Sequence, residues 1–344
     1  MKEKIAFRAD GSNSIGMGHI MESLAVAEAL QNSGLELYFI MKNYPEAVTK
    51  VQEAGYSTKV IDPKLTEKGS FRKTIQILKE KETFFLVTNL LEIQEDYSSE
   101  LKKNGIKCIS LDILGKINLK SDIIINRTTI NQRIQDYHND STVYYLGPKF
   151  FPLRKQFIGL DREPRQINQT VRKVLLCFGG GDEYNLSARV AWILGNFSGI
   201  SVTLVLGAAF KLEEELQEII ADLSQPPTII KDAKNMKELF LQNDLVICAG
   251  GSILYELAVS GTPALIIPMN DHQVENAQEF EKFESVITVA LHTEIEDQEI
   301  QSAIKRALDF QLRKKMSEAG KRVTDGRGAE RIAEIISKIV EEKC

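Results

Sequence analysis

Residues 8–19 read Arg8-Ala9-Asp10-Gly11-Ser12-Asn13-Ser14-Ile15-Gly16-Met17-Gly18-His19. This stretch follows the short apolar run Ile5-Ala6-Phe7 and precedes apolar residues at helical spacing, from Ile20 to Leu30. It therefore predicts a strand, a glycine loop and then a helix. Glycines let the backbone approach a ligand closely, and a helix N-terminus offers free N–H groups, so the loop suits a phosphate.

The loop contains a single histidine, His19, at the expected start of the helix. An imidazole in that place can move a proton near pH 7, which makes His19 a candidate general base. Gly16 and Gly18 are candidate substrate-binding positions beside it. A tight strand–helix turn with a solvated histidine fits the same motif equally well.

Composition limits the classes of function. The chain has 344 residues, enough for two domains, and its net charge of −5 comes from 43 basic and 48 acidic residues. The absence of a long basic run argues against nucleic acid as a partner. No apolar stretch reaches the roughly 18 residues of a membrane span, and the N-terminus leaves no room for a signal peptide. We therefore expect a cytoplasmic protein, with peripheral membrane contact left open.

The cysteines and histidines show no metal-binding pattern. The cysteines are far apart and form no CxxC pair, so those in apolar runs are expected to be small buried hydrophobes in a reducing compartment. The histidines form no HExxH or similar cluster, and we expect neither a metal site nor a cofactor. These residues are Cys108, Cys177, Cys248, Cys344, His19, His138, His272 and His292.

Short apolar runs alternate with amphipathic segments along the chain, which is typical of parallel sheets covered by helices on both faces. The pattern breaks near 146–170 and then restarts. We expect strands at 4–9, 35–41, 57–61, 84–88, 106–111, 122–126, 173–178, 201–206, 227–230, 244–248, 263–267 and 285–289. We expect an N-terminal Rossmann-like domain at 1–155, a linker at 156–170, a second Rossmann-like domain at 171–327, and an amphipathic helix at 328–344 that returns to the first domain.

The second half opens with another glycine loop, Gly179-Gly180-Gly181-Asp182, directly after an expected strand. Ligands bind at the carboxyl ends of strands in open α/β sheets, so Gly179 and Gly180 are candidate binding positions. The loop is neither a Walker A motif nor a clean GxGxxG. A glycine turn needed only for packing is the alternative.

A third motif is more specific. A buried-strand pattern ends in Gly250-Gly251-Ser252, and the helix that follows carries Glu256. The helix start suits a diphosphate, and Glu256, four residues after Ser252 on the same face, suits ribose hydroxyls. The polar stretch from Gln273 to Asn276 follows the next strand. It reads either as a solvated loop or as the other wall of a nucleotide-sugar pocket.

These residues carry a resemblance. The C-terminal half is similar to the donor domain of GT-B glycosyltransferases of the undecaprenyl-muramyl-pentapeptide N-acetylglucosaminyltransferase type. Most of the chain resembles the UDP-2,4-diacetamido-2,4,6-trideoxy-β-L-altropyranose hydrolase family of pseudaminic acid biosynthesis, which includes spore-coat polysaccharide relatives. The carriers are Arg8-Ala9-Asp10, Ile15 to Met21, Gly147-Pro148, Leu153-Arg154, Phe178-Gly179-Gly180, Gly250-Gly251-Ser252, Tyr255-Glu256-Leu257, Gly261 to Ala264, Gln273 to Ala277, Asp325-Gly326 and Gly328-Ala329.

The resemblance implies a GT-B fold, in which two Rossmann-like domains face each other across a cleft that holds the active site. It implies that UDP lies mainly on the C-terminal domain and that Arg154, Gln273 and Asn276 help to bind the substrate. It also implies that His19 activates a water, which attacks the anomeric carbon and releases UDP. The residues agree on His19, because no other histidine lies in a glycine loop. Helix N-termini can stabilise the leaving diphosphate without a metal.

Three positions depart from the family pattern. Glu22 occupies a position where an arginine is usual, and Asn89 one where a strand typically ends in aspartate. Ile113 replaces the second residue of a typical Asp-Asp pair. We expect all three to lie in the N-terminal domain and to change what the sugar or acceptor meets, not how the nucleotide is held.

Three functions remain open on this basis. The first is a nucleotide-sugar hydrolase that releases UDP from a UDP-linked amino or deoxy sugar, whose identity the sequence does not specify. The second is a GT-B glycosyltransferase that moves the sugar from UDP to an acceptor other than water. The third is a non-catalytic protein that binds nucleotide sugars. His19 favours an enzyme, whereas Glu22 and Asn89 favour the binding protein.

Overall fold

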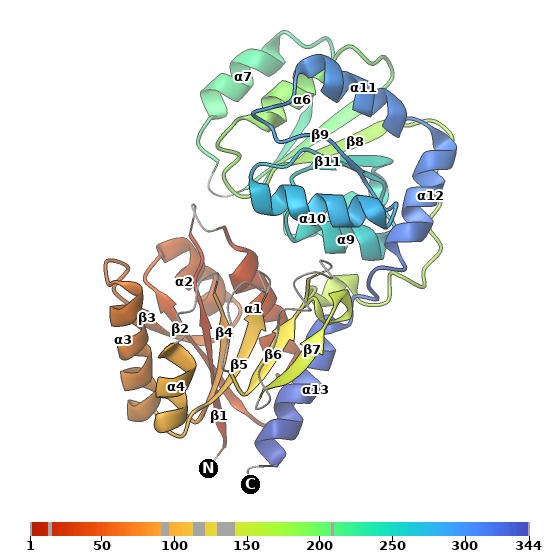
Figure 1. The fold of residues 1–344 in the computed structure, drawn as a ribbon. Helices are drawn as coiled ribbons and strands as arrows, with labels where there is room; N and C mark the ends of the chain where they lie inside the picture. Colours follow the sequence, from red (N-terminus) through yellow and green to blue (C-terminus); the bar gives the residue numbers. More distant parts are fainter. Residues whose placement is uncertain are drawn as a thin grey trace. The chain divides into compact units, whose positions relative to one another are not determined.

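The computed structural model describes residues 2–12, 16–90, 96–112, 121–128, 142–207 and 210–342. The chain divides into two compact units. The first combines Met1–Lys155 with Arg327–Cys344, and the second is Gln156–Gly326. Each unit is built on one parallel, Rossmann-like sheet, which confirms the predicted α/β fold (Figure 1).

The sheet of the first unit has seven strands in the order β3-β2-β1-β4-β5-β6-β7, and every neighbouring pair is parallel. Its central strands are almost fully buried, as near-continuous apolar runs predict. The strands are β1 (Lys4–Ala9), β2 (Glu36–Lys42), β3 (Ser57–Ile61), β4 (Phe85–Asn89), β5 (Lys107–Asp112), β6 (Ile123–Asn126) and β7 (Val143–Leu146).

Helices cover both faces of this sheet. One core includes apolar residues of α1, α2 and α13, and the other includes residues of α3 and α4. The first-unit helices are α1 (Gly18–Ala29), α2 (Pro45–Glu53), α3 (Glu67–Glu80), α4 (Asp96–Lys103), the 3₁₀ turn η1 (Pro148–Phe150) and α13 (Gly328–Glu341).

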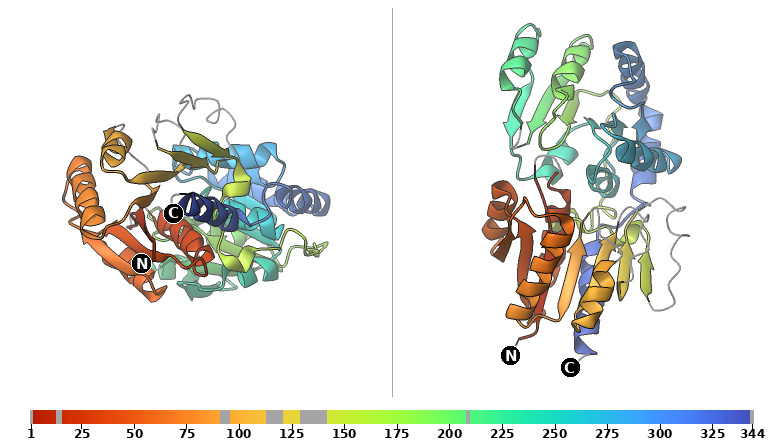
Figure 2. Two further views of the ribbon diagram at one scale, coloured as in Figure 1. Left: turned by 90° about the horizontal axis from the view of Figure 1, so that it is seen from below. Right: turned by 60° about the vertical axis from the view of Figure 1, so that its left-hand side comes forward.

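Helix α13 lies at the C-terminal end of the chain but belongs to the first unit. Its apolar residues Ile332 and Ile336 are buried in the same core as Ile20 and Leu24 of α1, and both chain ends lie in this unit (Figures 1 and 2). A Cβ on Gly328 would lie 2.1 Å from the carbonyl oxygen of Phe151, so only glycine fits at the start of α13.

The sheet of the second unit has six parallel strands in the order β10-β9-β8-β11-β12-β13. Its elements are β8 (Lys173–Cys177), α6 (Leu186–Leu194), β9 (Ser201–Leu206), α7 (Glu213–Ala221), β10 (Thr228–Lys231), α8 (Met236–Gln242), β11 (Leu245–Cys248), α9 (Ile253–Ser260), β12 (Ala264–Ile266), α10 (Asp271–Lys282), β13 (Ile287–Thr288), α11 (Asp297–Ala307) and α12 (Phe310–Gly320).

The segment between the first unit and β8, which includes the short turn η2 (Lys155–Phe157), is attached to the second unit by two arginines. Arg165 donates to the carbonyl oxygen of Asn243 at 2.7 Å. The buried Arg313 of α12 donates to the carbonyl oxygens of Asn168 and Gln169, both at 2.9 Å. Charged donors on backbone carbonyls hold this largely irregular stretch in place.

The expected strands coincide with β1–β6 and β8–β13 to within about two residues, the usual disagreement at element ends. Strand β7 was not predicted. Strand β7 has only four residues and lies at the edge of the sheet, where Val143 is 53% exposed. Its sequence therefore lacks the alternation of buried and exposed residues that marks a strand. The prediction that Cys108, Cys177 and Cys248 are small buried residues is confirmed. Asn13, Ser14, Ile15, Ile113, His138 and Cys344 lie outside the described residues.

Candidate functional site

In each sheet the strand order reverses at one point, between β1 and β4 in the first unit and between β8 and β11 in the second. Ligands of open α/β sheets bind at the carboxyl ends of strands at this switch point. At these two separate switch points, three of the four strands end in a predicted glycine loop: β1 in the loop of residues 8–19, β8 in Gly179-Gly180, and β11 in Gly250-Gly251. The fourth strand, β4, ends in Asn89.

The loop after β1 is closed by its own backbone. Gly16 has φ +80°, and its N–H donates to the carbonyl oxygen of Ser12 at 2.7 Å, which forms an isolated bridge. Helix α1 begins two residues later at Gly18, so His19 lies in its first turn, partly exposed. Met17, the N-cap residue, makes no side-chain capping hydrogen bond among the described residues. The N-cap side chain therefore leaves the first N–H groups of α1 uncapped.

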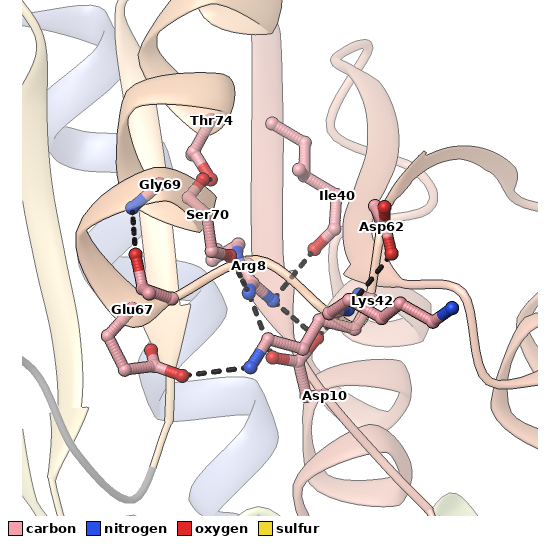
Figure 3. Close-up of polar contacts among 11 residues, drawn as sticks. Arg8, Asp10, Ile40, Lys42, Asp62, Glu67, Gly69, Ser70 and Thr74 are labelled. Atoms are coloured by element: carbon pink, nitrogen blue, oxygen red, sulfur yellow. Dashed lines mark hydrogen bonds and ion pairs between the residues drawn. The ribbon is translucent and has the colours of Figure 1, made fainter.

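A buried ion pair lies at the base of this loop (Figure 3). The guanidinium of Arg8 binds both carboxylate oxygens of Asp10, at 2.6 and 2.8 Å, and also donates to Ser70 of α3 at 3.1 Å. Asp10 accepts the backbone N–H of Lys42 at 2.7 Å, and the Lys42 ammonium pairs with Glu67 at 2.8 Å. Burial alone lowers the pKa of Arg8, but Asp10 more than offsets it. The network joins the carboxyl ends of β1 and β2 to α3.

A second buried cluster lies directly behind His19. It consists of Glu22 from α1, Asn89 from β4 and Arg127, which follows β6; their exposed fractions are 5%, 1% and 0%. Asn89 Nδ2 donates to the His19 carbonyl oxygen at 3.1 Å, and Arg127 forms an ion pair with Glu22. Burial and Arg127 lower the pKa of His19, whereas Glu22 opposes them. The net pKa is below the ordinary value, which keeps the imidazole neutral at pH 7, as a general base must be.

This cluster corrects one expectation. Glu22 and Asn89 were expected to alter what a sugar or acceptor meets, but both are buried and hydrogen-bonded to each other, at 3.1 Å. Their unusual identities therefore change the interior of the first unit and not a ligand-facing surface. The pairing was not visible in the sequence because Arg127 is 105 residues from Glu22.

In the second unit, the loop after β8 is held by a close backbone contact. Gly179 has φ +86°, a conformation that favours glycine. A Cβ on Gly207, directly after β9, would lie 2.4 Å from both Cα and the carbonyl oxygen of Gly180. Gly207 is thus a supporting residue that sequence reasoning missed, although a glycine directly after a strand was its available signal.

Asp182 occupies the start of α6. Its carboxylate accepts the N–H groups of Leu186 and Ser187, both at 2.9 Å, and the residue is 3% exposed. Burial raises the pKa of Asp182, and the hydrogen bonds from Ser187 and Leu186 act against that rise. Because a carboxylate already satisfies these N–H groups, the N-terminus of α6 is a poor site for a phosphate.

The loop after β11 is held by two amide side chains of α10. Gln273 Oε1 accepts the N–H of Gly250 at 3.3 Å and that of Met269 at 2.9 Å. Asn276 Nδ2 donates to the carbonyl oxygen of Gly250 at 2.8 Å. A Cβ on Gly250 would also lie 2.6 Å from the carbonyl oxygen of Gln273. Gln273 and Asn276 therefore position this loop, and a Gly250 substitution would displace it.

Helix α9 begins at this loop. Ser252, its N-cap residue, is exposed and makes no side-chain capping hydrogen bond within the described ranges. Glu256 lies one turn further along α9 and is partly exposed. In contrast to α6, α9 therefore begins at the carboxyl end of β11 with an exposed hydroxyl and with no side-chain cap among the described residues.

The structure groups the predicted site residues by unit. Gly16, Gly18, His19 and the half-buried Arg154 belong to the first unit, and the remaining candidates belong to the second. In the parts of the chain that the structure describes, no three His, Cys, Asp or Glu residues are arranged to hold a metal ion. None of the described helices is long and apolar enough to cross a membrane.

Comparison with known proteins bears on the second unit first. Residues 165–334 match the model of the glycosyltransferase family 28 C-terminal domain. In three dimensions, the structure of Acinetobacter baumannii MurG covers 98% of this chain and all of its own, with a TM-score of 0.71 and 15% identity. The chain thus has the GT-B fold that the sequence predicts.

Three relatives extend the match to both units. An uncharacterized protein of Methanocaldococcus jannaschii, MJ1062, is 30% identical. The match covers 79% of this chain but only 57% of the length of MJ1062. The spore coat polysaccharide biosynthesis protein SpsG of Bacillus subtilis is 24% identical over 97% of this chain and 98% of its own length. A UDP-2,4-diacetamido-2,4,6-trideoxy-beta-L-altropyranose hydrolase of Campylobacter jejuni is 23% identical. The match covers 74% of this chain and 87% of that relative. The chain is a distant homologue of these proteins.

Proposed function

We propose that this protein is a nucleotide-sugar hydrolase that releases UDP from a UDP-linked amino or deoxy sugar. The observation that carries the proposal is His19, a partly exposed imidazole in the first turn of α1, beside the switch point of the first sheet, with its pKa lowered. A neutral imidazole in such a place can accept a proton from water.

In the proposed reaction, the second unit binds the nucleotide. Glu256 accepts hydrogen bonds from the ribose hydroxyls, while Ser252 and the first N–H groups of α9 bind the diphosphate. The exposed Ser252 and the absence of a side-chain cap on α9 among the described residues support this assignment. Gln273 and Asn276 keep Gly250 and Gly251 in the required conformation. Gly179, Gly180 and Arg154 complete the proposed set of binding residues.

The chemical step uses the first unit. His19 takes a proton from a water molecule as the water oxygen forms a bond to the anomeric carbon. The bond between that carbon and the diphosphate oxygen breaks, and its electron pair leaves with UDP. The N-terminus of α9 stabilises the charge that develops on the leaving diphosphate. Gly16 and Gly18 give the backbone near His19 the close approach that a sugar requires.

The names of two relatives support this reaction and its setting. The C. jejuni relative is a UDP-sugar hydrolase, and the B. subtilis relative takes part in spore coat polysaccharide biosynthesis. We infer a role in surface-glycan biosynthesis of the pseudaminic-acid type. A glycosyltransferase with the same donor end is the second candidate, because the family model that matches residues 165–334 is that of a glycosyltransferase family.

The test is UDP release from a panel of UDP-sugars in oxygen-18 water. The proposal predicts release without an added acceptor and label in the free sugar. Label in UDP would mean attack at phosphorus. Release that begins only when a sugar or lipid acceptor is added would move the assignment to glycosyltransferase. UDP-sugar binding without release under either condition would leave a binding protein.

A further inference from the structure

The cluster behind His19 joins three elements of the first unit. Glu22 comes from α1, Asn89 from the carboxyl end of β4, and Arg127 from the residue after β6. All three are at least 95% buried, and Arg127 is fully buried. Charged groups are rarely buried to this extent unless they are paired, so the burial of each of these side chains depends on its hydrogen bonds to the others.

Asn89 is the centre of the cluster. Its Nδ2 donates to the His19 carbonyl oxygen at 3.1 Å, to Glu22 Oε2 at 3.1 Å and to Ser23 Oγ at 3.3 Å. Its Oδ1 accepts from Arg127 Nη2 at 3.1 Å. The donor and acceptor ends are assigned by chemistry, because a guanidinium can only donate and a carbonyl oxygen can only accept. The amide therefore ties the backbone of His19 to the end of β4.

Arg127 contacts the Oδ1 end of the Asn89 amide, whereas His19 contacts the Nδ2 end. Arg127 also pairs with Glu22 and lies 5.9 Å from the centre of the Phe151 ring. With Glu22 and Arg127 both charged, the cluster is neutral overall but places one charge of each sign near the imidazole. Asp10, at the end of β1, is the other charged group that acts on His19. An arrangement of this kind is sensitive to the loss of either partner alone.

We propose that Glu22, Asn89 and Arg127 act together as positioning residues for His19, a role that rests on the proposed function of His19 as general base. Asn89 fixes the first turn of α1, which has no side-chain cap among the described residues. The paired charges of Glu22 and Arg127 hold Asn89 and act in opposite directions on the imidazole. None of the three residues touches the substrate.

The test separates the two charges. Glu22→Gln leaves Arg127 facing His19, and Arg127→Met leaves the Glu22 carboxylate. We expect the pKa of His19 to fall by about one unit in the first variant and to rise by about one unit in the second. The double variant should return close to the wild-type value. The imidazole pKa is measured by NMR titration of protein labelled at histidine, with the His19 signal assigned by its absence in His19→Gln.

Activity provides an independent readout. If UDP release is observed, the acid limb of the kcat/KM profile should move with the His19 pKa, in opposite directions for the two single variants. Lys315→Gln removes one charge from an exposed ion pair in the second unit and should leave the titration unchanged. Asn89→Asp keeps the side-chain shape, removes the donor to the His19 carbonyl and places a second carboxylate beside Glu22, so kcat should fall while affinity for UDP stays.

The outcomes can be distinguished. If neither single variant folds, Asn89→Asp decides, because a wild-type kcat without the donor to the His19 carbonyl would overturn the positioning role. A His19 pKa that stays the same, or moves in one direction for both charges, would overturn the positioning role. Opposite movements of the pKa in an enzyme that releases no UDP would instead keep the cluster and reject the proposed function.

Discussion

The two switch points use different means to hold their loops. In the first unit, buried ions support the loop and α1: Arg8 with Asp10, and Arg127 with Glu22. In the second unit, the loops are supported by the neutral amides of Gln273 and Asn276 and by close backbone contacts of glycines. Asp182, a buried carboxylate of the second unit, caps α6.

This contrast follows from what each unit is proposed to bind. A residue that transfers protons benefits from a rigid, charge-balanced surrounding, because small shifts of charge move its pKa. A site for a diphosphate must keep its N–H groups free of carboxylates, which would compete with the ligand. The cap on α6 and the exposed start of α9 therefore favour α9 as the diphosphate site. The following predictions test this division from the largest expected effect to the smallest.

Removal of the proposed base should have the largest effect. His19→Ala should reduce kcat for UDP release by about 100-fold or more, since general base catalysis contributes roughly 10²–10⁴-fold. Affinity for UDP, measured by calorimetry, should stay nearly unchanged because the nucleotide is assigned to the other unit. If affinity collapses and turnover of bound substrate survives, His19 is a binding residue and the division between the units fails.

Loss of the proposed ribose carboxylate should weaken binding next. Glu256→Gln should reduce the free energy of UDP binding by about 1.5–3 kcal/mol, the range for hydrogen bonds to charged groups. Glu318→Gln is the matched control, because it removes the same charge from an exposed position on α12. Equal affinities of the two variants in calorimetry would argue against Glu256 as the ribose anchor.

The fold was predictable because its signals are local. Strand and helix periods, and the break in the pattern near 146–170, lie within short windows, and the glycine loops mark strand ends. The cluster of Glu22, Asn89 and Arg127 was not predictable, because its members come from distant segments that only the sheet order brings together. Gly207 was missed for a related reason: a glycine directly after a strand signals a turn, but only the structure shows that its missing side chain leaves space for Gly180.

The close contact between Gly207 and Gly180 can be tested by one methyl group. Gly207→Ala places a Cβ against backbone atoms that cannot rotate away, so the free energy of unfolding should fall by about 1–3 kcal/mol, as in other overpacked sites. Gly181→Ala is the control, since its Cβ would meet only the Glu183 side chain, at 3.6 Å. Urea unfolding of both variants measures the difference; equal losses would show that the contact is not tight.

The smallest effect concerns stability and pH. The pKa of His19 is lowered in the folded protein, so the unfolded chain binds more protons once the pH falls below the ordinary histidine value of about 6.5. Stability from the neutral imidazole is complete above that pH and decreases as the pH falls toward the folded-state pKa. Wild-type protein should therefore lose more stability than His19→Gln between neutral and mildly acidic pH, while the two curves run parallel above pH about 7. Curves that stay parallel throughout would mean that burial in the first unit leaves His19 as easily protonated as it is in the unfolded chain, and the lowered pKa assigned to His19 would then be wrong.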